Sequence, residues 1–152
     1  CSVKTMSEIA TGVTAGLAIC FDIVDDSLIR QMVSDGAEFI LAPTNNADFG
    51  HSDENVQQLA IARLRAIETG RSVVQVSTVG VSAIMAPDGR TISRLPTFTA
   101  GSMVEDVSLS TVTTPATVIG ASADWAIGGF AIAALALGGI LSRQERRARH
   151  HG

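Results

Sequence analysis

Cys20 is the residue whose type and setting first suggest chemistry. It stands at the end of a short apolar run at residues 13–19, and strand ends in α/β layers are where functional side chains gather. A thiolate is a strong nucleophile, but it forms at neutral pH only beside a base or a cation. The nearby charged residues Asp22, Asp25 and Asp26 are all acidic, so an activating group must come from elsewhere. Taken alone, Cys20 is better explained as a small buried side chain than as a nucleophile.

A second group of polar residues follows in the loop at residues 43–54, which is rich in Asn, Asp and Gly. We expect Asn45 and Asn46 to shape this loop through local hydrogen bonds, with a direct substrate contact as the alternative. Further along the chain, Arg65 and Glu68 have the i,i+3 spacing of a pair on a helix. For this pair we expect a structural role at the surface rather than a binding patch.

Metal-binding and nucleic-acid-binding patterns are missing from the sequence. Its two cysteines, Cys1 and Cys20, form no C-x-x-C pair, and two of its three histidines lie within residues 150–152. We therefore expect no metal site and no cofactor. The net charge is −4, and outside residues 143–152 seven basic residues oppose fourteen acidic ones. Nucleic-acid binding needs a basic face, so we expect no nucleic-acid partner.

The elements that must hold Cys20 are predicted by hydrophobic patterning. Residues 13–19 are typical of a buried strand, and the apolar positions within 28–33 predict a helix capped by Asp25 or Asp26. Residues 39–42 predict a second buried strand. A helix that joins two buried strands is typical of a parallel pair, so the fold class is α/β.

Alternating helix and strand patterns continue after the loop. Residues 55–69 predict an amphipathic helix that ends at Gly70 and buries a face containing Val56, Leu59, Ala60, Leu64 and Ile67. The turn sequence P-D-G-R at residues 87–90 predicts a hairpin between its flanks. The segments with strand-like patterns are residues 72–77, 81–86, 92–95 and 101–109.

The C-terminal region is apolar and then basic. Residues 125–142 contain no charged residue, and their apolar core would rise about 25 Å as a helix. That length is near the lower limit for crossing a bilayer core. Trp125 stands at one edge and four arginines follow the other, which by the positive-inside rule places the C-terminus in the cytoplasm. We predict a transmembrane helix at residues 123–142, with a buried core helix as the alternative.

Five separated blocks, in consistent order and spacing, carry a resemblance that extends over residues 13–149. The blocks are L-A-I-C-F-D at 17–22, G-A-E-F-I-L-A-P-T-N-N-A-D-F-G at 36–50, Q-L-A-I-A-R-L-R-A-I-E-T-G-R at 58–71, S-T-V-G-V-S-A-I-M-A-P-D-G-R at 77–90 and L-P-T-F-T-A-G at 95–101. Together they resemble the apolipoprotein N-acyltransferases of the nitrilase, or carbon-nitrogen hydrolase, superfamily. The chain is similar to the C-terminal piece of such a protein.

The resemblance implies a partial nitrilase-type α-β-β-α sandwich followed by one C-terminal transmembrane helix. Residues 1–110 would be the C-terminal half of the catalytic domain, and residues 111–122 a connector. Residues 123–142 would span the membrane, and residues 143–152 would form a basic cytoplasmic tail. The protein would reside in the bacterial inner membrane, with its catalytic part outside the cytoplasm.

The resemblance also implies a reaction. The family's cysteine falls on Cys20, which would attack a phospholipid ester and become a thioester acyl-enzyme. The acyl chain would then pass to the N-terminal diacylglyceryl cysteine of a lipoprotein, with a Glu as general base and a Lys stabilising the oxyanion. Neither the Glu nor the Lys has a counterpart here, so we expect an N-terminal half to carry both and this chain alone to be inactive. A nitrilase-like amidase and an inactive remnant are the alternatives.

Two departures from the family pattern lie near the expected site. Phe21-Asp22 stands where the family has Tyr-Glu, and Asp48 stands where it has a large aromatic residue. Asp22 would orient the site or pair with an arginine, or else cap the approach to the following helix. The residues expected to support the site are Phe21, Asp22, Asn45, Asn46 and Phe49.

Overall fold

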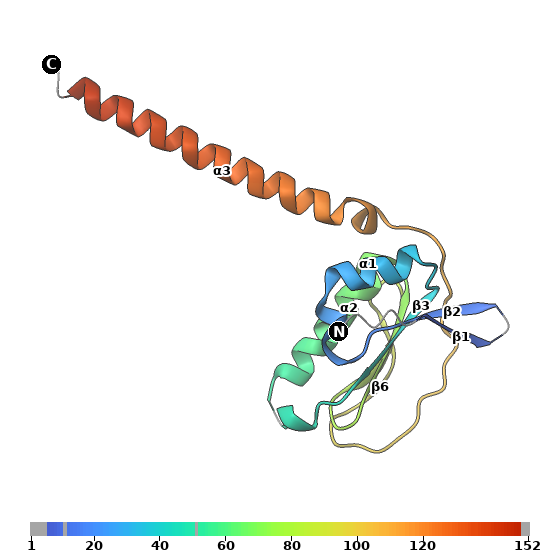
Figure 1. Cartoon of the computed structure of the whole chain (residues 1–152). Helices are drawn as coiled ribbons and strands as arrows, with labels where there is room; N and C mark the ends of the chain where they lie inside the picture. Colours follow the sequence, from blue (N-terminus) through green and yellow to red (C-terminus); the bar gives the residue numbers. More distant parts are fainter. Residues whose placement is uncertain (1–5, 11, 51, 150–152) are drawn as a thin grey trace. The chain divides into compact units, whose positions relative to one another are not determined.

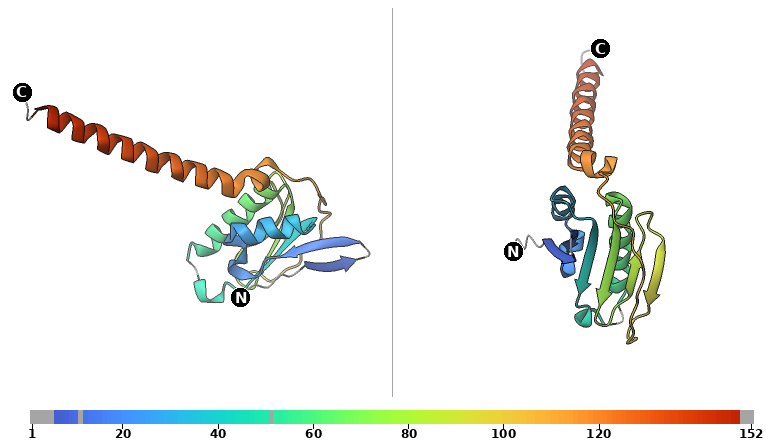
Figure 2. Two further views of the ribbon diagram at one scale, coloured as in Figure 1. Left: turned by 45° about the horizontal axis from the view of Figure 1, so that its top comes forward. Right: turned by 90° about the vertical axis from the view of Figure 1, so that its right-hand side faces the viewer.

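A mixed six-stranded sheet, in the order β1-β2-β3-β4-β5-β6, forms the centre of the computed structural model (Figure 1). The structure describes residues 6–10, 12–50 and 52–149, without the side chains of residues 6–10, 49, 121, 124 and 140–149. Strands β2, β3 and β4 are parallel to one another, and the other neighbours pair antiparallel. The strands are β1 (Met6–Ala10), β2 (Val13–Leu17), β3 (Phe39–Thr44), β4 (Ser72–Ser77), β5 (Ser82–Met85) and β6 (Thr91–Leu95). Figure 2 shows the twist of this sheet.

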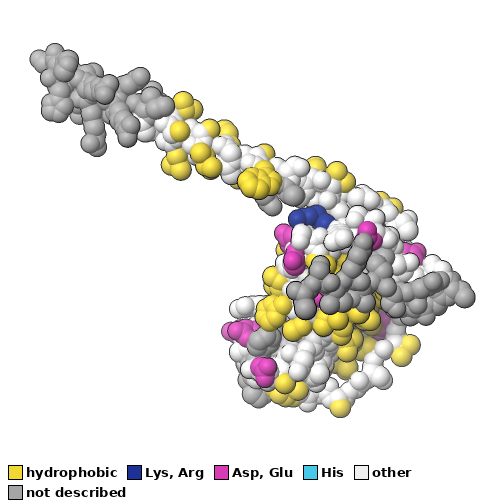
Figure 3. Space-filling model, viewed as in Figure 1, with side chains coloured by type: hydrophobic (Ala, Val, Ile, Leu, Met, Phe, Trp, Pro, Cys, Tyr) yellow, Lys and Arg dark blue, Asp and Glu magenta, His cyan; other side chains and the backbone are white. Residues whose placement is uncertain are grey.

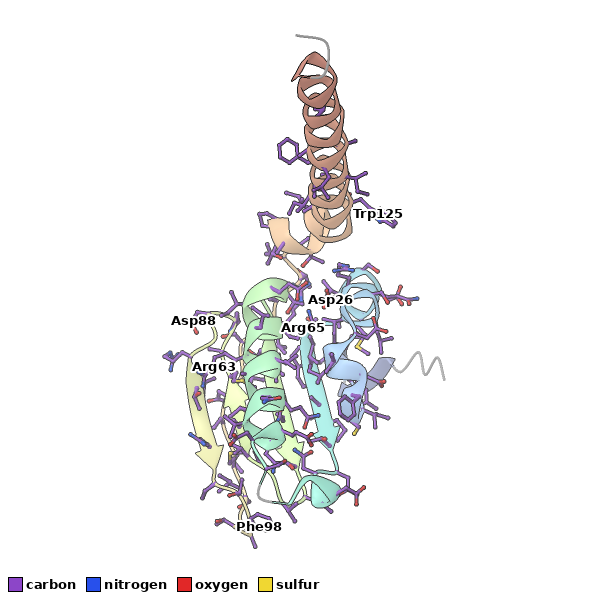
Figure 4. All side chains as sticks on the ribbon, turned by 90° about the vertical axis from the view of Figure 1, so that its left-hand side faces the viewer. Asp26, Arg63, Arg65, Asp88, Phe98 and Trp125 are labelled. Carbon is purple, nitrogen blue, oxygen red and sulfur yellow. The ribbon has the colours of Figure 1, made fainter. Side chains whose placement is uncertain are left out.

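Two helices, α1 (Asp26–Ser34) and α2 (Glu54–Thr69), lie on the same face of the sheet (Figure 4). Asp25 is the N-cap of α1, because its side chain accepts hydrogen bonds from the backbone N–H groups of Ser27 and Leu28. Gly70 ends α2 in the left-handed conformation, as the sequence predicted. Two short 3₁₀ helices, Cys20–Val24 and Ala47–Phe49, follow β2 and β3 respectively.

The hydrophobic core lies between the sheet and these two helices. Alternate residues of β3 are buried, as expected for a strand with one face against helices. Each large aliphatic side chain buried here contributes roughly 1.5–3 kcal/mol. The core residues include Ile29 and Met32 of α1, Leu59, Ala62 and Ala66 of α2, and Ile40, Ala42, Val73, Ala83 and Met85 of the sheet.

The buried face of α2 differs from the prediction. Val56, Leu64 and Ile67 are more than half exposed and Ala60 is exposed too, so their placement on the buried face was wrong. Two polar residues, Gln58 and Arg65, are buried instead, because the helix packs against the polar backbone of the Cys20–Val24 turn as well as against apolar side chains. The full set of buried α2 residues is Asn55, Gln58, Leu59, Ala62, Arg65, Ala66 and Thr69.

The segment after β6 is not the strand predicted at residues 101–109. It runs without regular structure until residue 114 and forms separate hydrogen bonds with the loop between β4 and β5 and with β4 itself. Phe98 N–H donates to the Val79 carbonyl at 2.9 Å, and the Ser72 hydroxyl donates to the Ser108 carbonyl at 2.8 Å. Isolated bonds of this kind replace a continuous ladder, so the sheet ends at β6 within the described residues.

Helix α3 (Pro115–Arg149) begins within the predicted connector at residues 111–122. The Thr114 hydroxyl accepts a hydrogen bond from the Thr117 N–H at 3.2 Å, and Pro115 occupies the first helical position. Both features favour a helix start, since a Thr cap satisfies a free N–H and proline lacks one. The chain divides into two compact units, residues 1–117 and residues 118–152.

The second unit is the remainder of α3, and the side chains of residues 125–139 are all exposed (Figure 3). In the part of the chain that the structure describes, no helix combines the length and the apolar character needed to cross a membrane. The transmembrane helix predicted at residues 123–142 is therefore not confirmed. Glycines and alanines make up much of this segment, and the side chains from residue 140 onward lie outside those described.

Candidate functional site

Cys20 lies at the carboxyl end of β2, where the chain turns sharply from the strand into a 3₁₀ helix. Its backbone φ of 56° lies in the left-handed region, which non-glycine residues seldom adopt. Such conformations persist only where the surrounding structure holds them, and they are frequent at functional sites. The Cys20 side chain is partly exposed and is a free thiol.

Cys20 lines an open hollow of about 410 Å³ at the carboxyl edge of the parallel strands. The ends of β2, β3 and β4 line it, through Ile19, Cys20, and residues 43–45 and 76–78. Its walls are mostly apolar, and no acidic or basic side chain is among the described residues that line it. A general base and an oxyanion-stabilising cation for the thiol must therefore come from outside this lining.

Asn45 and Asn46 lie side by side in the chain but have different surroundings. Asn45 is exposed at the hollow, and its Oδ1 accepts from the Ala47 N–H at 3.2 Å and from the Thr78 hydroxyl at 2.8 Å. Asn46 is fully buried, and its Nδ2 donates to Asn55 Oδ1 at 2.6 Å. Asn45 is therefore the one of the two that is positioned to contact a molecule in the hollow.

A buried polar network connects the end of β3 to α2 and to Cys20. Asn46 Nδ2 also donates to Gln58 Oε1 at 3.0 Å, and Gln58 Nε2 donates to the Cys20 carbonyl at 3.0 Å. The Thr44 hydroxyl donates to Asn46 Oδ1 at 2.6 Å. Sequence patterning did not identify Gln58, and the available signal was its helical spacing from Asn55, Ala62 and Arg65.

Gly80 allows this network to pack closely. A Cβ at this position would lie 2.6 Å from Ser77 Oγ and 2.7 Å from both Asn46 Nδ2 and Asn55 Oδ1. These distances are too short for nonbonded atoms, so a larger residue would displace the network. Glycine is required here for close approach rather than for an unusual backbone angle.

Phe21 and Asp22 follow Cys20 within the turn. Asp22 Oδ2 accepts from the Ile19 N–H at 3.1 Å, and the Asp22 N–H donates to the Ile19 carbonyl at 3.1 Å. This geometry is the local cap that was one of the alternatives for Asp22. Phe21 is 61% exposed and borders a smaller hollow of about 170 Å³ together with Val24 and Ile61.

Arg65 is buried, so the surface location expected for it was wrong. Its Nη1 contacts Glu68 Oε2 at 2.6 Å, which is the expected i,i+3 pair, and its Nη2 forms an ion pair with Asp26 (Figure 4). The same guanidinium also donates to the backbone of the turn, from Nε to the Ile23 carbonyl at 2.9 Å and from Nη2 to the Val24 carbonyl at 2.7 Å. Arg65 therefore has the structural role that was expected, in a different place.

The other expected site residues lie in the loop after β3. Asp48 is exposed within the short helix Ala47–Phe49, and the side chain of Phe49 lies outside those described. Lys4 is the only lysine in the sequence, and it also lies outside the described residues. Among the described residues, no cluster of His, Cys, Asp and Glu is arranged to hold a metal ion.

Comparison with known proteins gives a consistent family match. The family model described as carbon-nitrogen hydrolase matches residues 4–116. An apolipoprotein N-acyltransferase from Mycolicibacterium smegmatis is 41% identical over 108 residues, which cover 71% of this chain and 18% of the relative. Another from Shewanella oneidensis is 33% identical over 138 residues, covering 91% of this chain and 26% of the relative. This chain thus spans only about a fifth to a quarter of these curated relatives.

Solved structures show the same fold. A Saccharomyces cerevisiae member of branch 10 of the nitrilase superfamily superposes with a TM-score of 0.53 at 19% identity. The match covers 63% of this chain and 38% of the yeast chain. At this identity the likeness establishes a partial nitrilase-like α/β fold.

Proposed function

The chain belongs to the carbon-nitrogen hydrolase family, and on that basis we propose that it contributes the nucleophile of an apolipoprotein N-acyltransferase. The complete protein would move a fatty acyl chain from a phospholipid to the N-terminal diacylglyceryl cysteine of an apolipoprotein. Cys20 would carry the acyl chain between the two substrates. The donor is a membrane lipid and the acceptor a protein with a lipid anchor, so the reaction would take place at the bacterial inner membrane, and we place it on the side away from the cytoplasm.

The observation that carries this proposal is the setting of Cys20. It occupies a left-handed turn at the carboxyl end of a parallel strand and borders an open hollow. Catalytic residues in open α/β sheets gather at this edge. The mostly apolar walls, which include Ile19 and Val76, suit the hydrocarbon next to a fatty ester.

The chemistry divides into two half-reactions. In the first, the Cys20 thiolate attacks the ester carbonyl, the bond to the glycerol oxygen breaks, and the lysophospholipid leaves with a proton. In the second, the free amine of the acceptor attacks the thioester carbonyl, an amide forms, and the Cys20 thiolate is regenerated. A general base must take the proton from the thiol and later from the amine, and a cation must stabilise each oxyanion.

The base and the cation are proposed to be a Glu and a Lys supplied by residues outside this chain. The described residues that line the hollow include neither a base nor a cation, which supports a source for both outside this chain. Asn45, with its side chain at the rim of the hollow, is proposed to contact the substrate. Phe21, Asp22, Asn46 and Phe49 are proposed to support the site.

The acceptor distinguishes this function from that of an amidase. The test uses a longer protein that contains this chain, a phospholipid, and a synthetic peptide with an N-terminal diacylglyceryl cysteine. We expect the peptide to gain one acyl group on its amine, detected by mass spectrometry. The same peptide with an acetylated amine is the matched control and should gain nothing. Hydrolysis of simple amides without acyl transfer would contradict the proposal and indicate an amidase.

A further inference from the structure

Helix α2 bonds both ends of the turn that contains Cys20. At the start of the turn, Gln58 Nε2 donates to the Cys20 carbonyl at 3.0 Å. At its end, Arg65 donates to the Ile23 and Val24 carbonyls at 2.9 and 2.7 Å. Residues 58 and 65 are seven positions apart, which is about two helical turns and places them on one face of α2. One rigid helix therefore holds the whole five-residue turn.

Gln58 is itself held in a single orientation. Its side chain is buried, and its Oε1 accepts from Asn46 Nδ2, so its Nε2 must point towards the Cys20 carbonyl. Asn46 is fixed in turn by Asn55, whose Nδ2 donates to the Gly50 carbonyl at 3.0 Å. A rotation of the Gln58 amide would leave several buried groups without partners, which is strongly unfavourable.

Arg65 is fixed by charge as well as by hydrogen bonds. Glu68 lies on its own helix, and Asp26 lies on α1, so the guanidinium connects two helices to the end of the turn. A planar guanidinium can serve two carbonyls and two carboxylates at once, which a lysine cannot do.

We infer that Gln58 and Arg65 are positioning residues that hold Cys20 in its left-handed conformation and so aim its thiol into the hollow. Neither side chain lines the 410 Å³ hollow, although Gln58 lines the smaller hollow beside Phe21, and both act through backbone carbonyls. Because a residue at φ 56° would relax if released, loss of either contact should let the thiol leave its orientation. The expected effect on acyl transfer rests on the proposed function, whereas the expected effect on the orientation of the Cys20 thiol does not.

The first experiment needs no enzyme activity. In the 152-residue chain with Cys1→Ser, Cys20 is the only thiol, and its alkylation by iodoacetamide is followed well below the melting temperature. We expect Gln58→Met to change the rate constant about fivefold or more, because a thiol released from its fixed orientation has a different exposure to the reagent. Arg65→Lys keeps the charge but loses the forked geometry, and it should change the rate in the same direction.

Two controls separate positioning from stability. Gln57→Met makes the same substitution at the exposed neighbouring residue and should leave the rate unchanged. Val73→Ala destabilises the buried core at β4 but removes none of the side-chain hydrogen bonds that α2 makes to the turn, and it should also leave the rate of the folded chain unchanged. Equal alkylation rates in Gln58→Met and Gln57→Met would overturn the inference, as would an equal change of the rate in Val73→Ala.

The second experiment uses the longer protein and measures acyl transfer. Gln58→Met should lower kcat by about tenfold or more and leave KM nearly unchanged, because misorientation affects the reacting atoms rather than binding. A wild-type kcat in Gln58→Met would overturn the inference. If the wild-type protein transfers no acyl group, the proposed function fails, and the alkylation comparison still decides whether α2 positions Cys20.

Discussion

The turn at Cys20–Val24 and the C-terminal helix α3 differ in what holds them in place. The turn is bonded to α2 through Gln58 and Arg65. Gln58 is bonded in turn to Asn46, which follows β3, and Arg65 is paired with Asp26 of α1. In α3, the side chains of residues 125–139 are all exposed. The turn therefore depends on tertiary contacts between distant parts of the chain, whereas the α3 segment depends on local helix formation. Substitutions in the two regions should have different consequences, and this difference can be measured.

The largest loss of stability is expected from Arg65→Met. This change leaves the Ile23 and Val24 carbonyls without their donor and leaves Glu68 only its 3.9 Å ion pair with Arg30, and it should lower the free energy of unfolding by about 2–4 kcal/mol. Urea denaturation of the 152-residue chain measures it. Arg63→Met is the matched control, because Arg63 is exposed and bonds only the Thr91 hydroxyl among the contacts described. A similar loss in both variants would show that the turn is not held by Arg65.

A glycine in each region provides a second contrast. Gly80→Ala places a Cβ against Ser77, Asn46 and Asn55, and it should cost about 1–3 kcal/mol of stability. Gly128→Ala meets no described atom within 4 Å and should stabilise α3 by about 0.5–1 kcal/mol, because alanine favours helix. Thermal unfolding and helix content from circular dichroism measure the two effects. We expect Gly80→Ala to lower stability and Gly128→Ala to raise it. Changes in stability of the same sign would contradict the difference between the two regions.

The smallest effect concerns the cap of α1. Hydrogen bonds from the Ser27 side chain and from the Leu28 and Ser27 backbone lower the pKa of Asp25. A carboxyl with a lowered folded-state pKa adds stability above its unfolded pKa, about 3.9, and this stability is lost as the pH falls through the folded-state value. Asp25→Asn keeps a capping oxygen but does not titrate. The stability of the wild type should therefore fall more steeply than that of Asp25→Asn below about pH 4, as melting temperatures would show.

The elements that depend on local patterns were predictable. The strands β2 and β3, the helix α1 between them and the Asp25 cap follow from apolar runs and from an acid before a helix. The resemblance pointed to Cys20, and the structure places it at the edge of the sheet beside Asn45. The roles proposed for these two residues stay predictions.

The contacts around the turn were not predictable from sequence pattern. Arg65 bonds carbonyls 41 and 42 positions away, and on a helical wheel a charged residue is expected at the surface. Val56 and Leu64 are apolar yet exposed, so hydrophobicity alone gave the wrong face of α2. Helical spacing marks the buried face of α2, which includes Asn55, Gln58, Ala62, Arg65 and Thr69. Gln58 and Arg65 occupy this face because their side chains bond backbone carbonyls of the turn, and the sequence pattern does not show those bonds.

Trapping the acyl-enzyme is the most direct test of whether Cys20 is the nucleophile that carries the acyl group. A longer protein that contains this chain is incubated with a phospholipid and no acceptor, then digested and analysed by mass spectrometry. We expect an acyl group on the Cys20 peptide that neutral hydroxylamine removes. The Cys1 peptide should carry no acyl group, and neither should the peptide that contains residue 20 in the Cys20→Ser variant. An acyl group on another residue, or transfer at the wild-type rate by Cys20→Ser, would contradict it.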